Sequence, residues 1–124
     1  EVSWWIGASD LCVVLHRPVR LYPGDSMKLW EYLACARPVV ATAGEGYGDL
    51  VEALGAGVSV KGDDARALAQ RLCRLIQNPA AASKMGQSGR AAVLESHTWE
   101  SRAVELERVF GIFPAEPLRE RACA

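Results

Sequence analysis

A lysine and a glutamate stand near the start of one expected helix, directly after a loop that contains proline and glycine. The stretch reads Tyr22-Pro23-Gly24-Asp25-Ser26-Met27-Lys28-Leu29-Trp30-Glu31. A helix N-terminus presents backbone N–H groups without helical partners and a partial positive charge, and both favour a bound phosphate. Gly24 allows a ligand to approach the backbone closely, Ser26 adds a hydroxyl, and Lys28 adds an ammonium group.

Glu31 follows Lys28 by three residues, about one helical turn deeper. A carboxylate at that depth can accept hydrogen bonds from two neighbouring hydroxyls, such as the diol of a ribose. The spacing therefore suits a nucleoside diphosphate, with its phosphates at the helix start and its ribose at the acid. A second interpretation needs no ligand. Lys28 and Glu31 can form a surface ion pair worth roughly 0.2–0.5 kcal/mol, and Ser26 can be a plain helix cap.

Short apolar runs alternate with helical patterns along the chain. The runs at 11–15, 38–42 and 57–60 predict three strands. The first has no polar alternation, which indicates a strand buried on both faces. Helices are expected over 2–8, from 25 or 26 to about 35, over 49–54, after Asp63, after Asn78 and after Thr98.

Caps and apolar faces support the three later helices. Asp63 is the expected cap of a helix with one apolar face formed by Leu68, Leu72, Leu75 and Ile76. Asn78 and Pro79 are typical of a helix start. The last helix is expected to line one side with Trp99, Ala103, Leu106 and Phe110.

A loose glycine turn at 44–48 follows the second strand. It lacks the G-x-G-x-x-G spacing and the Walker lysine, so it reads as a plain turn.

This alternation predicts an α/β fold: a partial Rossmann-like parallel sheet of about three strands, helices on both faces, and two C-terminal helices. A full doubly wound sheet carries about five or six strands. We therefore expect strands to be missing on the N-terminal side and interpret the chain as a fragment. Ligands bind beyond the carboxyl ends of such strands, here residues 16–26, 43–48 and 61–63.

Composition excludes several classes of protein. Fourteen basic and fifteen acidic residues give a net charge of −1, so no basic excess favours nucleic acid or anionic lipid. No two of the four cysteines (12, 35, 73 and 123) have zinc-ligand spacing, and we expect free buried thiols in a reducing cytosol. No apolar stretch is long enough to span a membrane. We expect a cytoplasmic protein and leave open a peripheral position at the inner face of the membrane.

The segment from Ser26 to Ala41, SMKLWEYLACARPVVA, resembles the donor site of the group 1 (glycogen-synthase-like) glycosyltransferases. Their pattern is approximately S-P-x-K-x-x-E-Y-x-A-x-G-x-P-V-V-A. Further similarities lie at Ala8-Ser9-Asp10, Gly55-Ala56-Gly57-Val58, Asn78-Pro79, Met85-Gly86 and Thr98-Trp99-Glu100. The resemblance covers residues 1 to about 110, and we expect 111–124 to be a flexible tail.

The resemblance implies a GT-B enzyme with an N-terminal acceptor domain and a C-terminal domain for the nucleotide sugar. Residues 1–110 would be the second half of the donor domain, and the acceptor domain would lie elsewhere in the full-length protein. The substrates implied are a UDP- or GDP-sugar and an acceptor glycan, lipid or small molecule, without a metal ion or other cofactor. The resemblance implies donor contacts by Gly24, Asp25, Ser26, Met27, Lys28 and Glu31, and it identifies no catalytic residue.

Three departures from the family pattern stand out. Pro23 occupies the position of a glutamate found in many relatives eight residues before the ribose acid. Asp25 and Ser26 stand where Ser-Pro is common, and an aspartate there repels a diphosphate by up to about 1 kcal/mol unless it faces away. Ala36 replaces the usual glycine at the end of the helix.

Two other classes of function are open to this sequence. A non-catalytic α/β interaction or nucleotide-binding module would pair with a partner chain, since a three-stranded sheet leaves an edge that can accept strands. A stand-alone hydrolase fits poorly, because no serine sits on a nucleophile elbow and His16 and His97 fall in a loop and at a helix end.

Overall fold

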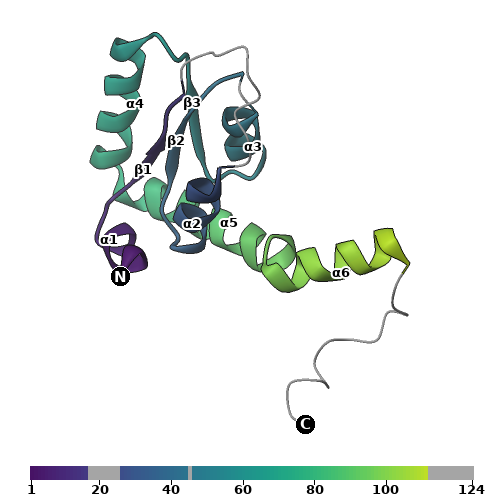
Figure 1. The fold of residues 1–124 in the computed structure, drawn as a ribbon. Coiled ribbons are helices and arrows are strands. Elements are labelled where there is room, and N and C mark those ends of the chain that lie inside the picture. Colours follow the sequence, from purple (N-terminus) through teal and green to yellow (C-terminus); the bar gives the residue numbers. More distant parts are fainter. Residues whose placement is uncertain (17–25, 45, 112–124) are drawn as a thin grey trace.

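The computed structural model describes residues 1–16, 26–44 and 46–111. In chain order the elements are α1 (Val2–Gly7), β1 (Cys12–Val14), α2 (Met27–Ala34), β2 (Val39–Thr42), α3 (Tyr47–Ala53), β3 (Gly57–Val60), α4 (Ala65–Gln77), α5 (Pro79–Ser96) and α6 (Trp99–Phe110). The strands form one parallel sheet in the order β1-β2-β3 (Figure 1). The predicted α/β class and the three parallel strands are confirmed.

Helices cover both faces of the sheet, as the sequence predicted. Successive side chains of a strand point to opposite faces, and the fully buried β2 follows this rule. Val39 and Ala41 pack into a core with Leu29 and Leu33 of α2. On the opposite face, Val40 packs into a second core formed largely with α4 and the start of α5. Figure 1 shows α4 on one side of the sheet and α3 on the other.

Helix α5 approaches the end of α2 unusually closely. A Cβ atom added at Gly86 would collide with the backbone carbonyl of Ala36, and one at Gly89 would lie 2.7 Å from Cδ2 of Leu33. Arg90 Nη1 donates a hydrogen bond of 2.5 Å to the carbonyl oxygen of Ala34. Glycine at these two positions therefore allows α5 to pack directly against the C-terminal end of α2.

The end of α2 is a Schellman motif with alanine in the left-handed position. Ala36 has φ of 55°. The Ala36 N–H bonds to the Leu33 carbonyl at 2.9 Å and the Arg37 N–H to the Tyr32 carbonyl at 3.0 Å, which is the hydrogen-bond pair of that motif. The alanine noted in the sequence thus occupies the position where glycine costs least.

Several sequence expectations need correction. Strand β1 is shorter than 11–15 and is not buried on both faces, since Val13 is 42% exposed on a strand that pairs only with β2 among the described residues. Helix α3 begins at Tyr47, two residues earlier than expected. The cap of α4 is Asp64, whose Oδ1 accepts a 2.8 Å hydrogen bond from the Ala67 N–H, and not Asp63.

The apolar face predicted for α4 is only partly buried. Leu75 is buried and Leu68 and Leu72 pack at the edge of the second core, whereas Ile76 is 60% exposed. The expected start of α5 is confirmed, because Asn78 Oδ1 accepts a hydrogen bond from the Ala81 N–H.

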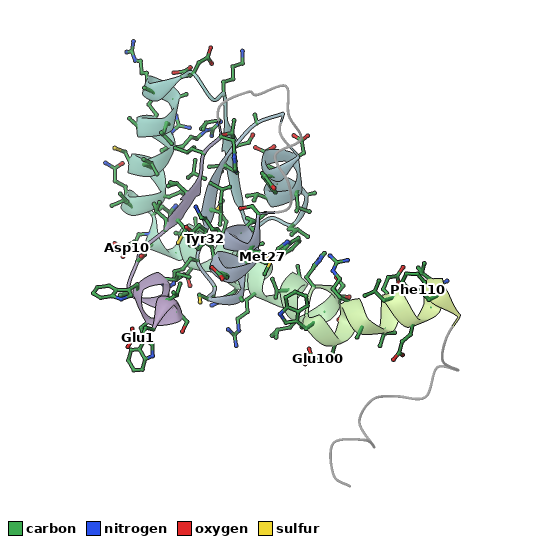
Figure 2. All side chains as sticks on the ribbon, in the orientation of Figure 1. Glu1, Asp10, Met27, Tyr32, Glu100 and Phe110 are labelled. Carbon is green, nitrogen blue, oxygen red and sulfur yellow. The ribbon has the colours of Figure 1, made fainter. Side chains whose placement is uncertain are left out.

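Helix α6 extends away from the sheet (Figure 1). It has no buried residue, and its predicted apolar side is open to solvent, with Trp99 76% and Phe110 65% exposed. Figure 2 shows Phe110 at the end of α6 that is remote from the sheet. Among the described residues, no helix is both long and apolar enough to cross a membrane.

The described cysteines are free thiols in three different settings. Cys12 is buried, Cys35 is partly buried and Cys73 is exposed, so burial is confirmed for the first alone. Burial raises the pKa of the Cys12 thiol, and the nearby Arg37 opposes that shift. Cys123 lies outside the described residues.

Candidate functional site

The carboxyl ends of β1 and β2 are joined through one threonine hydroxyl. Thr42, the last residue of β2, accepts a 2.9 Å hydrogen bond from the His16 N–H, and its hydroxyl donates to the His16 carbonyl at 3.3 Å. Ala43 N–H donates to the Val60 carbonyl at 2.7 Å, which extends the β2–β3 pairing by one residue. These bonds hold together the edge at which ligands of open α/β sheets bind.

The glycine turn after β2 brings α3 against this edge. A Cβ at Gly48 would lie 2.6 Å from the Thr42 carbonyl oxygen, so the first turn of α3 can pack there only without a side chain. Tyr47 is buried, and its ring lies 5.3 Å from the His16 ring, centroid to centroid. His16 lies in a loop at the strand ends, as the sequence predicted.

Glu52 ties α3 to β3 on the same side of the sheet. Its Oε1 accepts hydrogen bonds from the Ser59 hydroxyl at 2.7 Å and the Ser59 N–H at 3.0 Å. The hydroxyl bond is the main cause, and the backbone bond the second, of a pKa of Glu52 below its ordinary value. Because Glu52 is accounted for by this contact, we assign it a structural role.

The predicted donor-site residues meet at the start of α2. Ser26 is the N-cap by backbone conformation, but its side chain makes no capping hydrogen bond. Lys28 and Glu31 are both exposed. Within the part of the chain that the structure describes, neither forms an ion pair or a side-chain hydrogen bond. The surface ion pair is therefore not observed there, and Ser26 is the cap of α2 by its position without a capping side-chain hydrogen bond. Gly24 and Asp25 lie outside the described residues.

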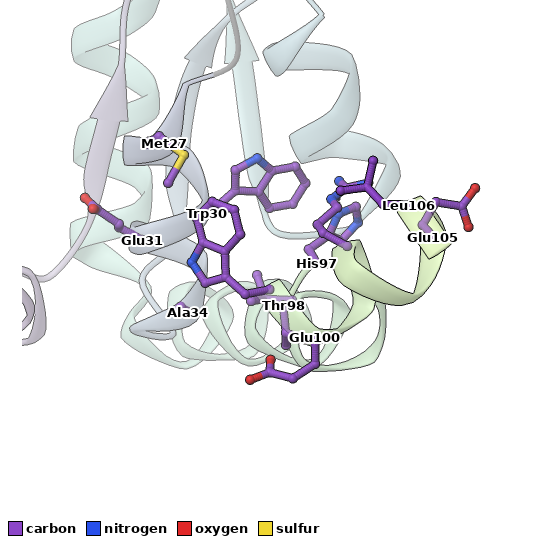
Figure 3. Close-up of a pocket in the computed structure, with 12 residues that line it drawn as sticks. Met27, Trp30, Glu31, Ala34, His97, Thr98, Glu100, Glu105 and Leu106 are labelled. Atoms are coloured by element: carbon purple, nitrogen blue, oxygen red, sulfur yellow. The ribbon is translucent and has the colours of Figure 1, made fainter. Parts of the chain in front are cut away.

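A pocket of about 710 Å³ runs along the outer side of α2. Met27 and Glu31 of the predicted set line it, whereas Ser26 and Lys28 do not. The opposite wall comes from the junction of α5 and α6, including Trp99 and Leu106. In Figure 3 the Glu31 carboxylate points away from His97, so it lies at the border of the pocket.

Sequence reasoning missed one cluster in this pocket. The rings of Trp30 and His97 are stacked, with centroids 4.1 Å apart and an interplanar angle of 21°. Arg102 Nη2 lies 3.1 Å from His97 Nδ1. Placing His97 at a helix end was correct, since it is the C-cap of α5. A contact between residues so far apart in sequence has no local signature.

No metal site is visible in the described ranges. Within residues 1–16, 26–44 and 46–111, no three His, Cys, Asp or Glu side chains are grouped so that they could hold a metal ion. The expectation that the donor site works without a metal stays a prediction.

The fold and this site define an α/β protein with a three-stranded parallel sheet and an exposed start of α2. A protein family described as glycosyl transferase-like matches residues 2–108, and the chain belongs to it. No curated protein sequence matches the chain.

Among solved structures, the chain is similar to sucrose-phosphate synthase from Thermosynechococcus elongatus. The TM-score is 0.75 and the sequence identity is 29%. The match covers 87% of this chain and 26% of that one, so the chain spans about a quarter of the enzyme's length. The architecture is therefore that of part of a GT-B enzyme, as the resemblance implied.

Proposed function

We propose that residues 1–110 are the second half of the donor-binding domain of a glycosyltransferase of hexosyltransferase type. In the full-length protein this domain would bind a nucleotide sugar, such as a UDP- or GDP-sugar, for transfer to a hydroxyl of a glycan, lipid or small molecule. The bond between the anomeric carbon and the diphosphate oxygen would break, the acceptor oxygen would bond to that carbon, and the proton of the acceptor hydroxyl would pass to the leaving diphosphate. We expect no transfer by this chain alone.

The start of α2 is the observation that carries the proposal. Backbone amides at a helix start favour an anion, and Ser26 does not satisfy one of them with its side chain. Lys28 would neutralise part of the charge on the leaving diphosphate, and Glu31 would accept hydrogen bonds from the ribose diol. Both side chains are exposed and uncommitted among the described residues, as a ligand site requires. The proposed site also includes Gly24, Asp25 and Met27.

Amide NMR of the 124-residue chain tests the proposal directly. On titration with UDP or GDP, we expect signals of residues 26–31 to shift more than those of α4. Glu31→Ala should weaken UDP binding by about ten- to a hundredfold, because hydrogen bonds to charged groups are worth roughly 1.5–3 kcal/mol. It should leave inorganic pyrophosphate binding unchanged, whereas Lys28→Ala should weaken both.

Matched controls separate site effects from general charge effects. Glu95 and Lys84 are exposed on α5, and we expect Glu95→Ala and Lys84→Ala to bind UDP like the wild type. A folded sample in which no signal of residues 26–31 moves at millimolar UDP and GDP would contradict the proposal. Equal losses in Glu31→Ala and Glu95→Ala would contradict the role of Glu31.

A non-catalytic module that pairs with a partner chain is the second candidate. Two observations favour it: the β1 edge exposes Val13 and Leu15, and α6 exposes apolar side chains along its length. Exposed apolar surface and an open strand edge are features of association sites. Native mass spectrometry distinguishes the two, since a monodisperse monomer that binds UDP supports the donor domain and counts against an obligate partner.

A further inference from the structure

A second cavity lies at the edge of the sheet where the strands begin. Asp10 and Leu11 directly precede β1, and Arg37 and Pro38 directly precede β2. Because the strands are parallel, the residues before them gather at one edge, opposite to the edge at which open α/β sheets bind their ligands. These four residues line a cavity of about 370 Å³, the amino-edge pocket. Pockets for small molecules measure about 300–1,000 Å³, so this one suits a small ligand.

Helices α4 and α5 supply the other wall of the amino-edge pocket. This wall contains Leu75 and Ile76 from the last turn of α4 and Pro79 and Ala82 from the first turn of α5. Leu75 and Ala82 are buried in the second core, and Leu11 packs against that core. Ile76, in contrast, is 60% exposed. The inner surface of the pocket is therefore apolar, and a ligand can cover one further apolar side chain at its rim.

Arg37 is held in this pocket by two backbone carbonyls. Its Nη1 donates a hydrogen bond of 2.9 Å to the Ser9 carbonyl, and its Nε donates one of 3.3 Å to the Cys35 carbonyl. A guanidinium has five N–H groups, and these bonds use two of them. The other three have no protein partner within the described residues. The guanidinium is thus fixed in position and retains the donors that bind a carboxylate through two parallel hydrogen bonds.

Asp10 brings the opposite charge to the same pocket. It is exposed on the link between α1 and β1 (Figure 2). Asp10 and Arg37 both line the pocket, yet among the described residues they form no ion pair with each other. A molecule that carries an ammonium and a carboxylate can therefore satisfy both charges at once.

We infer that the amino-edge pocket binds a free α-amino acid with an apolar side chain. Arg37 binds its carboxylate, Asp10 accepts hydrogen bonds from its ammonium group, and its side chain covers Ile76. A simple anion fits less well, because Asp10 repels negative charge. The inference goes beyond the proposed function and is independent of it, since none of the predicted donor residues that the structure describes lines this pocket.

Amide NMR of the 124-residue chain with millimolar L-leucine tests the inference. We expect signals of Leu11, Ser83 and Gln87, which line the pocket, to shift, while those of residues 26–31 stay in place. Glycine carries the same two charges without a side chain and should bind at least about tenfold more weakly.

Two analogues of leucine test the two charges separately. Isocaproate lacks the ammonium group and should bind about two- to fivefold more weakly than leucine, because an exposed ion pair contributes little. Isoamylamine lacks the carboxylate and should bind at least about tenfold more weakly, because it loses the paired hydrogen bonds to Arg37.

Substitution of Asp10 provides the matching test on the protein. Asp10→Asn should weaken leucine binding about two- to fivefold and leave isocaproate binding unchanged. Asp49 is exposed in the first turn of α3, and Asp49→Asn should bind leucine like the wild type. Arg37→Lys keeps the charge but loses the paired donors, so it should weaken leucine and isocaproate binding alike. If Arg37→Lys fails to fold, the analogues of leucine still test the contact with the carboxylate.

The outcomes decide the inference without reference to nucleotide binding. Leucine that moves none of the pocket amides overturns it, and so does equal binding of leucine and isoamylamine or of leucine and glycine. Equal losses in Asp10→Asn and Asp49→Asn overturn the role of Asp10. UDP titration is a separate measurement, and its result bears on the proposed function alone.

Discussion

Replacing Ala36 with glycine should stabilise this protein, although the same change destabilises most helices. Ala36 follows α2 with φ of 55°, in the left-handed region. An L-residue with a Cβ costs roughly 1–2 kcal/mol there, and glycine avoids that cost. Glycine also loses about 0.5–1 kcal/mol more conformational entropy on folding. The difference predicts that Ala36→Gly raises the free energy of unfolding by about 0.5–1 kcal/mol.

Urea unfolding followed by far-UV circular dichroism measures this change. We expect a higher midpoint with an unchanged slope, since the surface exposed on unfolding hardly differs. The melting temperature should rise by about 2–5 °C for a domain of this size. UDP binding should be unaffected, because Ala36 lies at the end of α2 opposite to the proposed site.

A matched substitution provides the control. Ala91 is exposed on α5, in an ordinary helical position. Ala91→Gly should destabilise the protein by about 0.8–1 kcal/mol, which is the usual penalty of glycine within a helix. If Ala36→Gly destabilises the protein as much as Ala91→Gly does, the left-handed assignment and the reasoning from it are refuted.

Two further predictions concern contacts that the structure assigns. Asp64→Ala should lower the free energy of unfolding by about 1 kcal/mol, because the Ala67 N–H loses its capping hydrogen bond. Asp63→Ala should change the free energy of unfolding little. Thermal melts of the two variants measure the difference, and equal effects would contradict the assignment of Asp64 as the cap. Because the bonds from Ser59 hold the pKa of Glu52 below its ordinary value, Glu52 contributes stability that is present above about pH 4.5 and lost as the pH falls through its folded pKa. Glu52→Gln should therefore be less stable than wild type at pH 7, by a difference that narrows as the pH falls below about 4.5, and a difference that does not narrow would count against this account.

The sequence predicted some features of the candidate site and could not predict others. The donor segment is contiguous, so its residue types and helical spacing can be interpreted from the sequence alone. Whether Lys28 and Glu31 are committed to each other depends on side-chain geometry, and the structure shows that they are not paired within the described residues. Asp63 and Asp64 are adjacent residues of the same type, so their sequence does not show which of them caps α4. The structure shows that Asp64 occupies the N-cap position.

The sequence alone determined the parallel α/β class, because short apolar runs separated by helical patterns can form little else. It also determined the start of α5, because the cap by Asn78 is a local signal. The tertiary structure decided how α5 meets α2 through Gly86 and that α6 projects from the sheet. It also brought His97 onto Trp30. These features depend on the distance between chain segments remote in sequence, which no periodicity of the residues encodes.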